Sequence, residues 1–234
     1  MIQTIAIDGP AASGKSVVGR RLAQRLDFWF LDTGIMYRAL TWLALEQGIS
    51  PNDGDGLGTL AGAVRLRPDS MQGESVEVEG TRVGPELREP RVDSNVSNVS
   101  RHSEVRKALV ERQREYAKSV TNRGNGMGQW RTGSGIVMVG RDIGTVVLPD
   151  AELKVFLNAS AGERASRRCR EMRQRGQAAD LAEVLSEIEA RDSIDSSRDA
   201  SPLRPAEDAW QLDTTCLDVD EVVSAILQRV NDVR

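Results

Sequence analysis

The residues GPAASGKS at positions 9–16 match in full the spacing of a phosphate-binding loop, GxxxxGK(S/T). Glycines at both ends allow positive φ angles and let the backbone approach an anion closely. The N–H groups of such a loop form an anion site at a helix N-terminus. Lys15 would then reach the β- and γ-phosphates, and the Ser16 hydroxyl would bind Mg²⁺. The loop therefore predicts a nucleoside triphosphate site, with an ordinary helix-capping loop as the alternative. The residues predicted to bind the triphosphate are Gly9, Pro10, Ala11, Ala12, Ser13, Gly14, Lys15, Ser16 and Val17.

Two further turns carry polar side chains directly after apolar runs. The turn 32–34 is followed one helical turn later by Arg38, and its hydroxyl, N–H groups and guanidinium could hold a phosphate. A helix N-cap at Asp32 or Thr33 is the alternative there. The turn 140–145 places Arg141 beside Asp142, and the alternative there is a solvated ion pair in an exposed turn.

Arginines are crowded into two segments near the C-terminal third of the chain, 164–175 and 191–198. A solvated charged helix face is the simpler interpretation of either segment. On a mobile segment above a triphosphate, arginines would instead stabilise the charge that spreads over a transferring phosphoryl group.

A parallel sheet would bring these turns together, because ligands of open α/β sheets bind beyond the carboxyl ends of the strands. The chain alternates apolar runs with helical periodicity, which predicts an α/β fold. The strands are expected at Thr4–Ile7, Phe28–Leu31, Ile136–Val139, Lys154–Leu157 and Gln211–Asp213. The helices are expected at Lys15–Leu26, Tyr37–Gln47, Val105–Val120, Ala161–Gly176, Leu181–Asp192 and Asp220–Val233.

Between residues 50 and 100 the pattern changes. Short alternating strands at Ala63–Arg67 and Ser75–Glu79 interrupt the β–α order, which indicates an inserted small subdomain. The segment Asn122–Gly135 is rich in glycine and is expected to be a surface loop.

Composition narrows the function further. The 234 residues carry a net charge of −4, so no overall basic field favours nucleic acid. No apolar run approaches the ~18 residues that span a bilayer, and we expect a cytoplasmic, monomeric protein without a membrane or nucleic-acid partner. Cys169 and Cys216 are expected to be free thiols, since the cytosol disfavours disulfides.

Taken together, these segments resemble the bacterial cytidylate kinase family of the nucleoside monophosphate kinases. The resemblance covers most of the chain, and its most specific parts are LDTGIMYR and GRDIGTVVLPDA. It is carried by the segments Ile7–Ser16, Leu31–Arg38, Glu86–Ser100, Glu104–Arg114, Gly140–Leu157, Glu163–Arg168 and Arg191–Leu203.

The resemblance implies transfer of the ATP γ-phosphoryl group to CMP or dCMP with Mg²⁺. It implies a single domain, 1–234, of the P-loop NTPase type. A parallel five-stranded core would carry an NMP-binding insert at 50–100 and a short lid at 160–180. The catalytic residues implied are Lys15, Arg141, Arg167, Arg168, Arg191 and Arg198. The substrate-binding residues implied are Thr33, Arg38, Ser97, Arg106, Arg141, Asp142, Arg191, Asp195 and Arg198, with Ser97, Arg106 and Asp142 at the cytosine.

Two departures from the family pattern matter. The family usually has an acid where this chain has Val139, which removes a carboxylate near Mg²⁺ that Asp32 or Asp142 could replace. The glycine-rich loop is also longer than usual. The competing hypotheses are a P-loop kinase for another small metabolite or nucleoside monophosphate, and a nucleotide-dependent switch without an acceptor.

Overall fold

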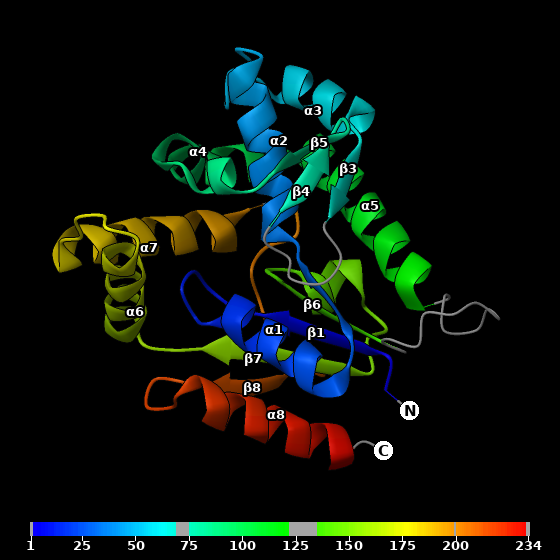
Figure 1. Ribbon diagram of the computed structural model, residues 1–234, viewed down its shortest axis with the longest axis vertical. Helices are drawn as coiled ribbons and strands as arrows, with labels where there is room; N and C mark the ends of the chain where they lie inside the picture. Colours follow the sequence, from blue (N-terminus) through cyan, green and yellow to red (C-terminus); the bar gives the residue numbers. More distant parts are fainter. Residues whose placement is uncertain (1, 69–74, 122–134, 199, 233–234) are drawn as a thin grey trace.

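A five-stranded parallel sheet forms the base of the structure, a computed structural model that describes residues 2–68, 75–121, 135–198 and 200–232 (Figure 1). The strand order is β2-β6-β1-β7-β8, and every neighbouring pair is parallel. This confirms the predicted α/β fold with five parallel strands. The strands are β1 (Thr4–Asp8), β2 (Trp29–Asp32), β6 (Ile136–Gly140), β7 (Leu153–Asn158) and β8 (Trp210–Asp213).

Helices cover both faces of the sheet, which explains the continuous apolar runs in its strands. The side chains of Ile5 and Ile7 belong to the core with α1 (Lys15–Leu26) and α8 (Val219–Asp232). Ala6 points to the other core, which includes residues of α2 (Gly34–Glu46) and α5 (Ser103–Thr121). The alternation along β1 thus divides the interior into two cores on opposite sides of the sheet.

The segment between residues 50 and 100 folds as an inserted unit above the sheet. Its three short strands are antiparallel in the order β3-β4-β5. The elements are α3 (Gly54–Ala63), β3 (Leu66–Pro68), β4 (Val76–Val78), β5 (Thr81–Val83), the 3₁₀ turn η1 (Pro85–Arg88) and α4 (Pro90–Ser100).

Sequence patterns missed two helices and misplaced a strand in this insert. The strand predicted from Ala63 was wrong at its start, because Ala63 closes α3 instead. Glycine-rich α3 has poor intrinsic helix propensity, and it is capped by Asp53, whose side chain accepts a hydrogen bond from Gly56 N at 3.0 Å. Packing of α3 against α5 then stabilises this helix despite its low intrinsic propensity.

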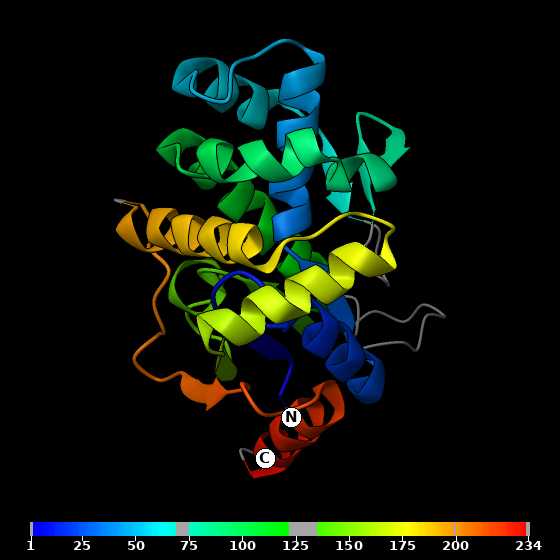
Figure 2. The ribbon, with the colours of Figure 1, turned by 90° about the vertical axis from the view of Figure 1, so that its left-hand side faces the viewer.

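Two helices lie across one side of the molecule, between the insert and the sheet (Figure 2). They are α6 (Ala161–Gln174) and α7 (Leu181–Ser197), capped by Ser160 and Asp180. The prediction that α7 stops at Asp192 was wrong, because the helix continues to Ser197. Asp195 is therefore held on the same helix as Arg191 rather than on a loop after it. A small apolar cluster joins the two helices to Ala11.

Three further sequence predictions concern the cysteines, the glycine-rich loop and membrane spans. Cys169 is buried, Cys216 is exposed, and both are free thiols, as predicted. Most of the predicted glycine-rich loop, at 122–134, lies outside the described residues. Among the residues described, no helix is both long and apolar enough to cross a membrane.

The register of the sheet aligns the three polar turns. Asp8, at the end of β1, lies opposite Gly140 at the end of β6. Asp32, at the end of β2, lies opposite Val139. The phosphate-binding loop and the turns that begin at Thr33 and Arg141 therefore start at one edge of the sheet.

Close packing of α1 on the sheet depends on Gly19. A Cβ there would lie 2.5 Å from Val139 Cγ1 and 3.0 Å from a ring carbon of Phe30. We expect Gly19→Ala to lower the free energy of unfolding by about 1–3 kcal/mol, through overpacking. The loss should be much smaller in a Val139→Ala background.

Urea denaturation of the unmodified protein, Gly19→Ala, Val139→Ala and the double variant measures this coupling. Gly62→Ala is the matched control, because a Cβ at that position in α3 meets nothing within 4 Å. An equal loss of unfolding free energy from Gly19→Ala with and without the Val139 side chain would contradict the packing described.

Candidate functional site

The phosphate-binding loop joins β1 to α1 and needs glycine at both ends. A Cβ on Gly9 would lie 2.1 Å from the carbonyl oxygen of Leu157, and Gly14 has φ +90°. Residues 11–17 line a large cleft, whereas Gly9 and Pro10 are not among the lining residues. The loop thus presents its backbone to the cleft from Ala11 onward.

Lys15 is folded back over this loop. Its Nζ donates hydrogen bonds to Pro10 O at 2.6 Å and to Ser13 Oγ at 3.1 Å. Burial lowers the pKa of Lys15 well below its ordinary value, and the nearby charge of Arg141 lowers it further. An anion in the loop would compensate this cation.

The turn after β2 connects to the loop through Asp32. Asp32 Oδ2 accepts a hydrogen bond from Ser16 Oγ at 2.5 Å, and Oδ1 accepts one from Gly34 N at 3.0 Å. Asp32 therefore binds the first backbone amide of α2 and also contacts the triphosphate loop. Thr33 lines the cleft, and its buried hydroxyl donates to Val139 O at 3.0 Å.

At the insert side of the cleft, Arg106 and Asp142 form a buried ion pair. Arg106 Nη2 lies 2.5 Å from Asp142 Oδ2, and Nη1 donates to Ser100 O at 3.2 Å. The guanidinium stacks over the ring of Tyr37 at 5.4 Å. Ser97 of α4 lines the same cleft, so the three residues expected at the cytosine are brought into one site.

Asp195 of α7 organises two arginines, Arg141 directly after β6 and Arg198 directly after α7. Its carboxylate lies 2.8 Å from Arg141 Nε and 3.3 Å from Arg198 Nη1. Burial opposes ionisation of Asp195, but these arginines and Arg191 outweigh it, and the pKa lies below the ordinary value. Burial and the neighbouring Arg141 lower the pKa of Arg191 to about 10, although Asp195 and Asp93 act in the opposite direction.

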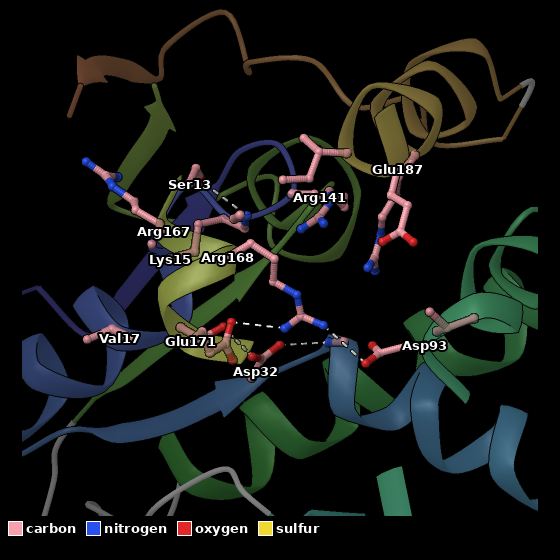
Figure 3. Close-up of a pocket in the computed structure, with 18 of the residues that line it drawn as sticks. Ser13, Lys15, Val17, Asp32, Asp93, Arg141, Arg167, Arg168, Glu171 and Glu187 are labelled. Atoms are coloured by element: carbon pink, nitrogen blue, oxygen red, sulfur yellow. Dashed lines mark hydrogen bonds and ion pairs between the residues drawn. The ribbon is translucent and has the colours of Figure 1, made fainter. Parts of the chain in front are cut away.

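The side chains of Arg167 and Arg168, the two arginines expected on the lid, point in different directions. Arg168 reaches from α6 toward Asp93 of α4 (Figure 3), at 3.2 Å between Nη2 and Oδ2. Arg167 instead donates to Thr214 O at 2.5 Å and to Thr214 Oγ1 at 3.0 Å, beside the phosphate-binding loop. Both line the cleft, but only Arg168 lies toward the insert.

Sequence reasoning missed two carboxylates of this site. Asp8 accepts hydrogen bonds from Ile143 N at 2.8 Å and Gly144 N at 2.7 Å, and so fixes the turn that carries Arg141 and Asp142. Its position as the last residue of β1 could have identified it. Asp93 was not identifiable, because α4 itself was not predicted.

The comparisons with known proteins agree with this geometry. A sequence model of the family described as "Cytidylate kinase" matches residues 5–232. The chain is 49% identical to a cytidylate kinase of Exiguobacterium sibiricum over 96% of this chain and 95% of the relative. It is 44% identical to a cytidylate kinase of Listeria monocytogenes over 95% of this chain and 93% of the relative.

Among solved structures, an uncharacterized protein from Eubacterium ventriosum matches with a TM-score of 0.49 and 13% identity, covering 98% of each chain. The family assignment is carried by the sequence relatives instead.

The fold and the cleft define a P-loop phosphotransferase of the nucleoside monophosphate kinase class. Within that class, the chain belongs to the cytidylate kinase family, for which ATP is the phosphate donor. The predicted family is confirmed, and the alternative of a kinase for another metabolite is not supported.

The burial of Asp8 leads us to expect that the site is sensitive to pH. Burial raises the pKa of Asp8 from 3.8 to about 6, although its two backbone hydrogen bonds favour the carboxylate. The carboxylate therefore gains a proton as the pH falls through about 6, which weakens its hold on the turn 143–144.

We expect kcat/KM to fall on the acid side of this pKa, and Asp8→Asn to be less active at pH 8 but to lack that acid limb. Steady-state rates between pH 5 and pH 8 measure the effect. Asp220→Asn, at an exposed carboxylate, is the control. An unchanged acid limb in Asp8→Asn would show that another group titrates.

Proposed function

We propose that the protein transfers the γ-phosphoryl group of ATP to CMP or dCMP with the help of Mg²⁺, and that its cleft has a donor half and an acceptor half. The observation that carries this division is an arginine cluster that neighbours two polar sites. Arg141 and Arg191 lie close enough to Lys15 to lower its pKa further than burial does, and the charges of Arg106 and Asp142 act on Arg198. The phosphate-binding loop is one of these sites, and the Arg106–Asp142 pair is the other.

The donor half consists of the phosphate-binding loop and its neighbours. Loop N–H groups and Lys15 would hold the triphosphate, as they do in P-loop kinases. Val17, which is 54% exposed, and Arg167 line the cleft beside the loop, where the rest of the donor nucleotide would lie.

The oxygen groups beside the loop fit Mg²⁺. This ion prefers hard oxygen ligands and is usually held by one or two protein groups together with phosphate oxygens. The Ser16 hydroxyl would bind the ion, and its hydrogen bond to Asp32 would orient it. Asp142 is occupied by Arg106, and Val139 is an apolar residue of β6 buried beneath α1, so Asp32 takes the place of the missing acid. When bound, Mg²⁺ neutralises charge on the phosphates.

The acceptor half reads the base through a buried carboxylate and a buried guanidinium. Cytosine offers an amino group that suits the Asp142 carboxylate, and acceptors at N3 and O2 that suit the Arg106 guanidinium. Ser97 supplies a small adaptable hydroxyl. Uracil reverses the pattern at N3 and position 4, which would leave buried groups of the protein unpaired.

Between the two halves, arginines would hold the phosphates in line. Arg38 and Arg141 would face the acceptor phosphate. Arg141 and Arg198 contact the Asp195 carboxylate, and Arg191 lies close enough to lower its pKa. In the part of the chain that the structure describes, the Nε atoms of Arg191 and Arg198 are buried without a hydrogen-bond partner. These groups would stabilise the charge on the transferring phosphoryl group, and closure of α6 would bring Arg168 to it. Transfer then needs positioning and charge stabilisation rather than a covalent enzyme intermediate.

Base selection supplies the test of this proposal. We expect kcat/KM for CMP to exceed that for UMP by at least ~10²-fold, because each unpaired buried polar group costs roughly 1–3 kcal/mol. Asp142→Asn should reduce this preference, mainly through lost activity with CMP. A coupled ADP-release assay with CMP, dCMP, UMP, AMP and shikimate measures it.

Asp220→Asn serves as the matched control, since it removes an exposed carboxylate paired only with Arg21 among the described residues. Equal use of CMP and UMP by the unmodified protein would contradict the proposed pocket.

Removal of the Lys15 side chain should lower activity without lowering stability. We expect Lys15→Ala to reduce kcat by at least ~10²-fold, as when one preorganised charge stabiliser is removed. The melting temperature should not fall, because the folded state buries the Lys15 ammonium close to Arg141. Lys107→Ala, an exposed site on α5, is the control for both measurements. Near-normal turnover of folded Lys15→Ala would remove the loop from the mechanism.

A further inference from the structure

We propose that Asp93 is a built-in competitor of the acceptor's phosphate: its carboxylate occupies Arg38 of the acceptor half and Arg168 of α6 until a nucleoside monophosphate displaces it. The inference rests on the proposed function for the identity of the acceptor. It assigns a role to a side chain that no sequence motif marked.

The geometry places the Asp93 carboxylate between two arginines from different parts of the chain. Its Oδ1 lies 2.6 Å from Arg38 Nη1, and its Oδ2 lies 3.2 Å from Arg168 Nη2. All three side chains are mostly buried, with exposures of 24% for Asp93, 13% for Arg38 and 25% for Arg168. A carboxylate that bridges two guanidinium groups in this way occupies a position suited to a phosphate.

The surrounding charge shows that this position belongs to the acceptor site. The pKa of Arg191 is lowered by burial and by its neighbour Arg141, while Arg38 lowers it further and Asp93 raises it. Arg141, Arg38 and Asp93 therefore lie close enough to Arg191 to influence its pKa, and all four residues line the same cleft. A phosphate held by Arg38 and Arg141 would lie beside the negative charge of Asp93.

A phosphate is expected to displace the Asp93 carboxylate from these guanidinium groups. A phosphate monoester carries a charge near −2 and three strong acceptor oxygens, so it competes well with a single carboxylate for guanidinium groups. A ligand without a phosphate has no means of displacing Asp93. The Asp93 charge therefore weakens binding of the acceptor, and it does so only through the phosphate group.

The same exchange connects acceptor binding to the lid. Asp93 is on α4 of the insert, and Arg168 is on α6 (Figure 3). Departure of the carboxylate frees Nη2 of Arg168, while Nη1 stays bound to Glu171 at 3.0 Å. An arginine suited to the transferring phosphoryl group thus becomes free when the acceptor arrives.

The experiment compares the Kd of CMP and of cytidine, measured by isothermal titration calorimetry, for the unmodified protein and four variants. Asp93→Asn removes the charge and keeps the shape. Asp93→Ser is a second neutral variant in case the first is unstable, and Asp93→Glu keeps the charge. Glu171→Gln is the matched control, because it removes the other carboxylate bound to Arg168 and does not contact Arg38. Thermal melting checks the fold of each protein.

We expect the neutral variants to bind CMP at least about fivefold more tightly and to bind cytidine with an unchanged Kd, as a nearby like charge affects only the phosphate. Asp93→Glu and Glu171→Gln should remain within about twofold of the unmodified protein for both ligands.

Weaker or unchanged CMP binding in the folded neutral variants would overturn the inference and leave the proposed function intact. An equal gain for cytidine would also overturn it, because the effect would then not act through the phosphate. Failure of the unmodified protein to bind CMP would instead contradict the proposed function itself.

Discussion

The site depends on one constraint, the parallel register that ends β1, β2 and β6 at the same edge of the sheet. Asp8 lies opposite Gly140, and Asp32 lies opposite Val139. Two hydrogen bonds from the turn 143–144 to Asp8 then fix the segment that carries Arg141 and Asp142. A shift by one residue would exchange the side chains that face the two cores and separate the phosphate-binding loop from the acceptor arginines.

This convergence has an electrostatic consequence. Lys15 and several arginines lie close together in a partly buried cleft, and burial, together with the neighbouring charge of Arg141, lowers the pKa values of Lys15 and Arg191. Three carboxylates, Asp93, Asp142 and Asp195, hold arginines in place. Phosphate groups would supply the additional negative charge, because preorganised cations in a low-dielectric site interact strongly with anions.

Sequence patterns predicted the sheet and most of the site because the signals were local. The spacing of residues 9–16 and the apolar run 136–139 each fixed an element and its polar end. The insert was predicted poorly, because glycine-rich α3 is held by packing against α5 rather than by propensity. Contacts between distant elements, such as Asp93 with Arg168, depend on tertiary arrangement and had no pattern in the sequence.

The central claim is that donor and acceptor phosphates meet at the arginine cluster between the two halves of the cleft. A crystal structure with CMP and a non-hydrolysable ATP analogue tests it most directly. The account predicts the cytosine against Arg106 and Asp142, with its phosphate at Arg38 and Arg141 and the triphosphate in the loop at residues 9–16. A cytosine bound beside Thr214–Leu217, with the Arg106–Asp142 pocket empty, would contradict it.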